Sequence, residues 1–211
     1  MAPPWSAPLF GPGSKSREIV IERLVRGGAF GSGLEIRGWK EREDLSSLIG
    51  HMINDVHKAA FPDTSVPETA KKLDYVLGLA DDGTMMDKAG IDRFQLLSPY
   101  RTGFAGTIAV NLKMQESYRS GNEFAARGND NATKKGDKIV ITENVYKRGG
   151  LAFANGMTVI VDGDGRIRFA DTQDPVGMHE VGKESLELAY DITVHKGQGS
   201  GFDYVGSIIP Q

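Results

Sequence analysis

LELAYDITVHKGQGSGFDYV (186–205) is the stretch from which the fold of this 211-residue chain can be inferred. Its first half, LELAYDITVH (186–195), predicts one long apolar strand, and a polar loop rich in glycine follows. In open α/β sheets, loops at the carboxyl ends of the strands present backbone N–H groups and side chains to a shared crevice. The polar side chains expected at that edge are Thr193, His195, Lys196, Gln198 and Ser200. We therefore expect a binding loop here, the alternative being a solvated glycine-rich loop.

A second segment predicts the same kind of layer. RFQLLSPY (93–100) is a short apolar run that ends at Ser-Pro, which fits a buried strand. TGFAGTIAVNLKMQESY (102–118) follows with its apolar residues at helical spacing. Strand, sharp loop and helix in this order are typical of a parallel sheet, so the predicted fold class is α/β.

Upstream of this layer the sequence predicts a leader, two extended pieces and two helices. Residues 1–16 hold four of the nine prolines and no apolar period, which predicts a flexible leader. The extended pieces are REIVIERL (17–24) and LEIRGW (34–39), with GGAFGSG (27–33) as an interruption. Apolar residues at spacings of three and four predict a helix over 42–60, and Pro67 marks the start of a second helix.

Downstream, the helical pattern stops and short β-branched stretches replace it. A polar segment, GNEFAARGNDNATKKGD (121–137), separates the two patterns. The stretches are KIVITENVY (138–146), MTVIV (157–161) and RIRF (166–169). They predict a small antiparallel β unit. Because the α/β pattern returns at residue 186, we interpret this unit as an insertion in the α/β domain.

Composition excludes several classes of protein. The formal net charge of −3 gives no global basic field, so any nucleic-acid contact must be local. The absence of cysteine excludes a disulfide scaffold, a thiolate zinc site, an iron–sulfur cluster and a cysteine nucleophile. The sequence has no apolar run long enough to span a bilayer and no signal-peptide pattern. We therefore expect a cytoplasmic protein with no membrane partner.

Metal-binding patterns are incomplete. The histidines other than His195 are too scattered along the sequence to predict a metal site. VDGDGRI (161–167) begins like a calcium loop, but Gln173 stands where the bidentate glutamate is needed. This stretch therefore predicts a hairpin turn, and the sequence predicts no metal site.

The glycine-rich stretch resembles motif V of superfamily 1 nucleic-acid helicases, and specifically that of the RecD-like branch. The residues that match the pattern are Ala189, Tyr190, Ile192, Thr193, His195, Lys196, Gln198, Gly199, Ser200 and Phe202. Gly201 departs from the pattern, because the family usually has glutamate at this position. The resemblance therefore does not extend to the ribose or domain-bridging contact that a glutamate would make at this position.

Two further segments resemble the same family in the correct order. FQLLSPYRTGFAGTIAVNLKMQ (94–115) is similar to motif IV. KKGDKIVITENVYKRGGLAFANGMTVIV (134–161) is similar to the Src-homology-3-like β-barrel, domain 2B, that RecD-like helicases carry ahead of motif V. The resemblance implies a RecA-like, P-loop NTPase-type parallel-sheet domain with a small inserted antiparallel β-barrel. Its parts would be a first motor-domain part over 17–133, the barrel over 134–185, and a truncated last part over 186–211.

The resemblance also implies roles for site residues. Arg101 would stabilise charge on the γ-phosphate of ATP, the role of an arginine finger. Gln198 and Gly199 would lie near that phosphate. The residues that would contact the backbone of single-stranded DNA are Thr193, His195, Lys196 and Ser200.

ATP and Mg²⁺ would be cofactors of a longer parent helicase. The P-loop pattern G-x-x-x-x-G-K-[ST] is absent, and GPGSKS (11–16) does not match it. We therefore expect the chain to be the second motor domain, inactive alone and without tightly bound nucleotide. Its partners would be the N-terminal motor domain of the same parent and single-stranded DNA.

Other functions stay open at this point. The first alternative is a non-catalytic module that binds nucleic acid or protein through its β unit. The second is the helicase part of a conjugative relaxase, or an RNA-directed helicase of the same superfamily. A γ-phosphate sensor such as Arg101 favours a motor domain over a module, because a pure binding module has no use for one.

Overall fold

The computed structural model describes residues 28–30, 34–37, 39, 41–120, 123–126, 132–147, 149–170 and 174–209. The predicted leader over 1–16 and the predicted strand over 17–24 lie outside these residues. The chain divides into two units, Met1–Leu48 and Ile49–Gln211. In the described residues, no helix is long and apolar enough to cross a membrane.

The first unit contains a short hairpin and the start of a helix. Strand β1 (Gly28–Phe30) pairs antiparallel with β2 (Leu34–Ile36). The prediction of an interruption over 27–33 is therefore wrong at residues 28–30, where the backbone finds a strand partner in β2. Helix α2 (Arg42–Ala60) begins in this unit and continues into the second, which confirms the helix predicted over 42–60.

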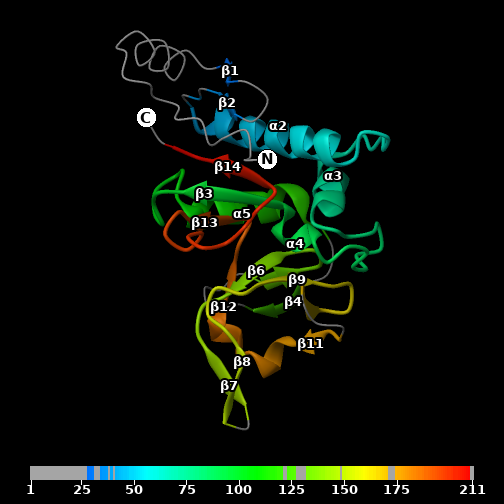
Figure 1. Ribbon diagram of the computed structural model, residues 1–211, viewed down its shortest axis with the longest axis vertical. Helices are drawn as coiled ribbons and strands as arrows, with labels where there is room; N and C mark the ends of the chain where they lie inside the picture. The colour runs from blue at the N-terminus through cyan, green and yellow to red at the C-terminus, as the bar shows by residue number, and fades with distance from the viewer. Residues whose placement is uncertain are drawn as a thin grey trace, which may run out of the picture. The chain divides into compact units, whose positions relative to one another are not determined.

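A three-stranded parallel sheet lies in the second unit (Figure 1). Its strands are β3 (Phe94–Ser98), β13 (Asp191–Thr193) and β14 (Tyr204–Ser207), in the order β13-β3-β14. Besides the end of α2, this unit contains the helices α3 (Thr69–Val76), α4 (Gly90–Arg93) and α5 (Thr107–Tyr118), and α5 packs against β13. Strand β3, the sharp loop and α5 confirm the α/β prediction for this segment. The RecA-like assignment goes further than these elements and stays a prediction.

An antiparallel sheet of five strands lies below the parallel sheet in Figure 1. Its order is β11-β10-β9-β6-β12, with β6 (Lys138–Ile141), β9 (Thr158–Val161), β10 (Arg166–Phe169), β11 (Val176–Gly177) and β12 (Leu186–Leu188). The remaining elements are β4 (Glu123–Ala126) with β5 (Ala132–Lys134), β7 (Val145–Lys147) with β8 (Gly150–Phe153), and two short helical turns, Met178–Glu180 and Lys183–Ser185. The core packed on the five-stranded sheet is aliphatic and aromatic, and it includes the fully buried residues Ile139, Val159, Ile167 and Phe169.

The antiparallel unit is confirmed as a feature of the fold, but the closed barrel is not. Among the described strands the sheet has two ends, β11 and β12, that do not pair with each other. The physical reason lies in β12: after Leu188 the chain leaves this sheet and joins the parallel one as β13. The sheet is therefore open in the described part of the chain.

This change of sheet corrects the prediction of one long strand over 186–195. Two side-chain amides satisfy the backbone where the ladders stop. Asn111 donates to the carbonyls of Leu188 and Asp191, at 3.1 and 2.8 Å, and accepts from the Asp191 N–H at 2.9 Å. On the other side, Gln95 donates to the carbonyls of Ala189 and Tyr190, each at 3.0 Å. Backbone bonds contribute as well, since the Ala189 N–H donates to the Lys138 carbonyl and the Leu96 N–H to the Tyr190 carbonyl, so the buried backbone stays paired through the bend.

A buried polar network joins the same bend to the antiparallel unit. The Tyr190 hydroxyl donates to Asp137 at 2.7 Å and accepts from the Arg119 guanidinium at 2.8 Å. Arg119 also pairs with Asp74 on α3 at 2.6 Å. Burial raises the pKa of Asp137, opposed by hydrogen bonds from Lys134, Tyr190 and Gln115 and by the charge of Arg119. The network therefore fixes three segments around the residue that precedes β13.

Lys138 makes a second link between the two sheets. Its ammonium donates to the Phe94 carbonyl at the start of β3, at 3.0 Å, and lies 5.7 Å from the centre of the Phe202 ring. Burial lowers the pKa of Lys138 to about 8. Together with the Tyr190 network, this contact fixes the antiparallel unit against the sheet whose carboxyl edge is the candidate site.

Candidate functional site

The loop after β3 places Arg101. The first N–H groups of α5 donate back into this loop, Thr107 to the Tyr100 carbonyl at 3.0 Å and Ile108 to the Arg101 carbonyl at 3.2 Å. Gly106 has to be glycine, because a Cβ there would lie 2.3 Å from the Thr102 carbonyl oxygen. The backbone of Arg101 is thus held by the helix, while its side chain is 50% exposed.

The loop after β13 places the other predicted residues. The Val194 N–H donates to the Ser98 carbonyl at 3.1 Å, so this loop starts beside the loop that carries Arg101. Thr193 then closes a turn: its carbonyl accepts from Gly197 at 3.0 Å and its hydroxyl from the Lys196 N–H at 3.3 Å. Gly199 has a φ of +83°, a conformation that favours glycine. The polar side chains that this turn leaves exposed are those of His195, Lys196, Gln198 and Ser200.

One carboxylate joins the two loops. Glu187 on β12 accepts from both terminal nitrogens of Arg101, at 2.7 and 3.3 Å, and lies 3.6 Å from the Lys196 ammonium. Burial acts to raise the pKa of Glu187, but the hydrogen bond from Arg101 and the charge of Lys196 outweigh burial and lower the pKa. Glu187 is therefore ionised at neutral pH and compensates two cations.

A cavity of about 70 Å³ opens beside this charge cluster. The side chains lining it include Arg101, Asn111, Glu187, Asp191, Thr193 and Lys196. Asp191 is buried and accepts from the Ser98 hydroxyl at 2.5 Å, while its other oxygen has no hydrogen-bond partner in the described part of the chain. Burial raises the pKa of Asp191 to about 7, although the Ser98 hydrogen bond acts in the opposite direction.

The structure brings together some of the predicted residues. Arg101, Thr193 and Lys196 line the same cavity, although about 90 residues of sequence separate the first from the other two. The exposed turn beside it carries the other four: His195, Gln198, Gly199 and Ser200. None of these four lines the cavity.

Sequence reasoning missed Glu187, Asp191 and Asn111. Glu187 and Asp191 are the acidic residues of the otherwise apolar run LELAYDITVH, and that charge was a signal available in the sequence. Asn111 is a polar residue on the buried face of α5, and its function depends on a contact 80 residues away. No local pattern indicates such a contact.

The described residues contain no group of three or more histidine or acidic side chains that could hold a metal ion. The calcium-like stretch is a hairpin turn between β9 and β10, as predicted. Asp162 accepts from the N–H groups of Asp164 and Arg166, at 3.0 and 2.9 Å, and from the Arg168 guanidinium at 2.9 Å. Its oxygens are therefore used by the turn itself.

Comparison with known proteins gives a weak similarity. The chain is 29% identical over 124 residues to an ATP-dependent RecD2 DNA helicase from Deinococcus radiodurans. The match covers 54% of this chain and 16% of that protein, so the chain aligns with about a sixth of its curated relative. No protein-family model matches the sequence.

Proposed function

We propose that this chain is a helicase-related, DNA-binding α/β protein, and more specifically the second motor domain of a RecD-like helicase. The similarity to the Deinococcus radiodurans enzyme supports the helicase relation. The observation that carries the proposal is geometric. Arg101, from the loop after β3, and Thr193 and Lys196, from the loop after β13, meet at the carboxyl edge of a parallel sheet. This is where α/β proteins bind their ligands.

The exposed turn suits a nucleic-acid backbone. Single-stranded DNA presents phosphate oxygens, which accept hydrogen bonds from hydroxyl, imidazole and ammonium donors. The turn offers such donors on Thr193, His195, Lys196 and Ser200. With a net charge of −3 on the whole chain, this local group has to supply the attraction.

Arg101 suits a phosphate group of ATP. A guanidinium presents parallel N–H donors that match phosphate oxygens, and the backbone of Arg101 is fixed by α5. In this proposal Gln198 and Gly199 lie beside the same phosphate. An N-terminal motor domain of the parent helicase would supply the remaining nucleotide contacts and the Mg²⁺ site. When bound, Mg²⁺ supplies charge stabilisation to the phosphates of ATP.

A double variant tests the proposal. Fluorescence anisotropy of a labelled single-stranded oligonucleotide is measured at low and moderate salt with the wild type and with Thr193→Ala/His195→Ala. We expect salt-sensitive binding by the wild type and an affinity about fivefold to tenfold lower in the variant. The variant lacks two side chains that donate hydrogen bonds to the phosphates of the DNA backbone. Tyr146→Ala, on the β7–β8 hairpin, is the control and should bind like the wild type. Equal affinities for the wild type and the double variant would contradict the proposal.

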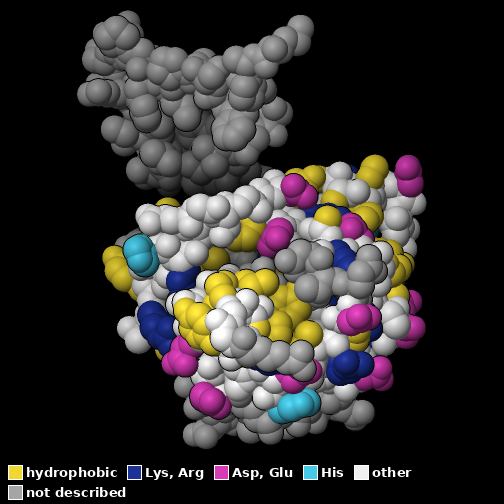
Figure 2. Space-filling model, turned by 60° about the horizontal axis from the view of Figure 1, so that its bottom comes forward, with side chains coloured by type: hydrophobic (Ala, Val, Ile, Leu, Met, Phe, Trp, Pro, Cys, Tyr) yellow, Lys and Arg dark blue, Asp and Glu magenta, His cyan; other side chains and the backbone are white. Residues whose placement is uncertain are grey.

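One observation favours the alternative of a non-catalytic binding module. The β7–β8 hairpin exposes Tyr146 (65%) and Leu151 (54%) beside Lys147. Figure 2 shows the molecule with the bottom of the Figure 1 view turned forward. Hydrophobic side chains gather on this face, and charged side chains of both signs surround them. An aromatic and a cation together are a common way to hold an unstacked base. In that case Tyr146→Ala, and not the double variant, would lose binding.

A further inference from the structure

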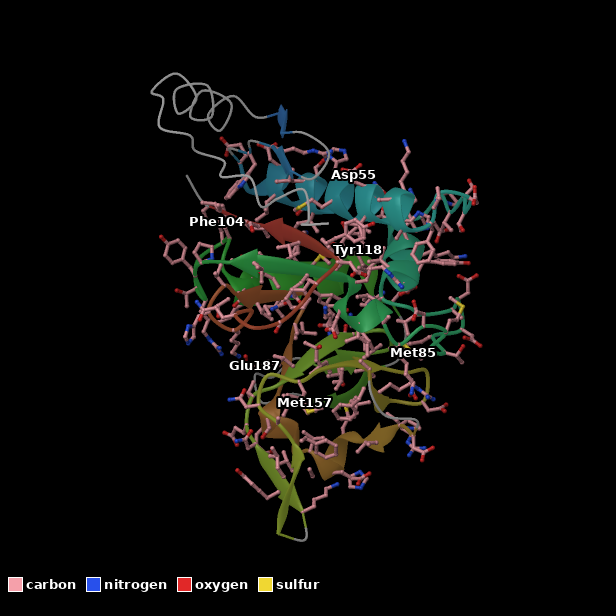
Figure 3. All side chains as sticks on the ribbon, in the orientation of Figure 1. Asp55, Met85, Phe104, Tyr118, Met157 and Glu187 are labelled. Carbon is pink, nitrogen blue, oxygen red and sulfur yellow. The ribbon has the colours of Figure 1, made fainter. Side chains whose placement is uncertain are left out.

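Glu187, which is labelled in Figure 3, has no role in the proposed DNA or nucleotide contacts. On β12 it alternates with Leu186 and Leu188, which are buried, so its side chain points out of the antiparallel core. Its backbone is held in register opposite Val140 on β6. The carboxylate itself is 26% exposed and touches cations from two separate loops.

The contacts of Glu187 use the donors that a phosphate would need. Each of its oxygens accepts from one terminal nitrogen of Arg101, which is the two-pronged arrangement that guanidinium groups also make with phosphate. Its Oε2 also lies 3.6 Å from the Lys196 ammonium. A phosphate-bearing ligand therefore competes with Glu187 for the charge of Arg101 and of Lys196.

We infer that Glu187 is a positioning residue that acts as an internal counter-ion, shared between the nucleotide-facing Arg101 and the DNA-facing Lys196, and that it links the two sites. This inference rests on the proposed function, because it takes the two ligands from there. When a phosphate binds Arg101, Glu187 pairs with Lys196 alone. Lys196 then attracts the DNA backbone less strongly, so nucleotide bound at Arg101 lowers the affinity for DNA at Lys196.

Oligonucleotide binding tests the shared counter-ion without nucleotide. The substitution Glu187→Gln removes the carboxylate that pairs with Lys196, so the full charge of Lys196 is available to the DNA backbone. We expect about threefold tighter binding of single-stranded DNA, the fold-change of a partly exposed ion pair. We also expect a slope of log affinity against log salt that is steeper by about 0.7, the value for one more phosphate contact. Glu116→Gln, an exposed glutamate on α5, removes the same charge elsewhere and controls for net charge.

A variant of Arg101 tests the link. Arg101→Gln reproduces the state in which Arg101 is bound to a phosphate, because in both cases Glu187 pairs with Lys196 alone. We expect weaker DNA binding by Arg101→Gln and full recovery in Arg101→Gln/Glu187→Gln, to the affinity of Glu187→Gln. A double variant that stays weak would mean that Arg101 touches DNA directly, which overturns the link. In a Lys196→Ala background, Glu187→Gln should bring no gain.

The outcomes separate this inference from the proposed function. If Glu187→Gln binds no better than Glu116→Gln while Thr193→Ala/His195→Ala still weakens binding, the inference alone is wrong. If no variant differs from the wild type, or the wild type does not bind the oligonucleotide, the proposed function and the inference both fail.

Discussion

Replacement of Arg119 by methionine is expected to lower the free energy of unfolding by about 3–5 kcal/mol, the usual effect of breaking a buried ion pair by removing one partner. The Arg119 side chain is 3% exposed and pairs with Asp74 at 2.6 Å and with the Tyr190 hydroxyl at 2.8 Å. Methionine keeps most of the volume and loses every donor. Asp74 would then hold its charge in a partly buried site with only the charge of Lys135 to oppose burial, which already raises its pKa.

Urea unfolding followed by circular dichroism measures this effect. Lys147→Met is the matched control, because the ion pair of Lys147 with Glu180 is far more exposed and should contribute little to stability. Adding Asp74→Asn to Arg119→Met removes the stranded charge and should recover part of the loss. If Arg119→Met were as stable as Lys147→Met, the network around Tyr190 would not contribute to the stability of the fold.

Asp191→Asn is expected to stabilise the protein by about 2–4 kcal/mol at pH 8 and to leave it nearly unchanged at pH 4. The pKa of Asp191 is about 7 in the folded chain and ordinarily 3.8. Between these values the folded state holds a proton that the unfolded state has lost. The contribution of Asp191 to stability therefore falls as the pH rises from about 4 to about 7. Asparagine keeps the acceptor for Ser98 and has no charge to bury.

Unfolding free energies of the two proteins at pH 4, 6 and 8 check this prediction. Asp74 and Asp137 also have raised pKa values, so the pH curve of the wild type contains their contributions as well. The difference between Asp191→Asn and the wild type isolates residue 191. Asp63→Asn, at an exposed position, serves as the control. A difference that does not change with pH would show that Asp191 is not protonated in the folded chain.

The elements that could be predicted from the sequence are those with a clear local period. The helix over 42–60 has apolar residues every three or four positions, and the predicted bounds are the observed ones. The segment from β3 to α5 has an apolar run, a proline and a helical period, and it too was found. In both segments the local pattern and the tertiary packing favour the same structure.

The bend within 186–195 could not be predicted, because its cause is not local. The apolar period continues from Leu186 to Ile192, as one strand would require. The chain nevertheless changes sheets after Leu188, and Asn111 and Gln95, which are distant in sequence, help to satisfy the backbone there. The same change of sheet leaves the antiparallel sheet open at β12. A resemblance to a barrel-containing family therefore predicted closure that the described strands do not have.

The candidate site was predicted in part. The loop over 193–200 follows from residue types at a strand end, whereas Arg101 follows from the resemblance to RecD-like helicases. Their meeting in one cavity depends on the parallel pairing of β13 with β3. Glu187 was missed because a glutamate in a strand ordinarily faces solvent. Only the fold shows that this one lies between two cations.

Hydrogen–deuterium exchange of the chain with and without a single-stranded oligonucleotide tests the central claim most directly. The account predicts that the oligonucleotide slows amide exchange over residues 193–202, at the carboxyl edge of the parallel sheet, and leaves the β7–β8 hairpin over 145–153 unchanged. Protection confined to that hairpin would contradict the account, because it would place nucleic-acid binding on the antiparallel unit and leave the site around Arg101 and Lys196 without its proposed ligand.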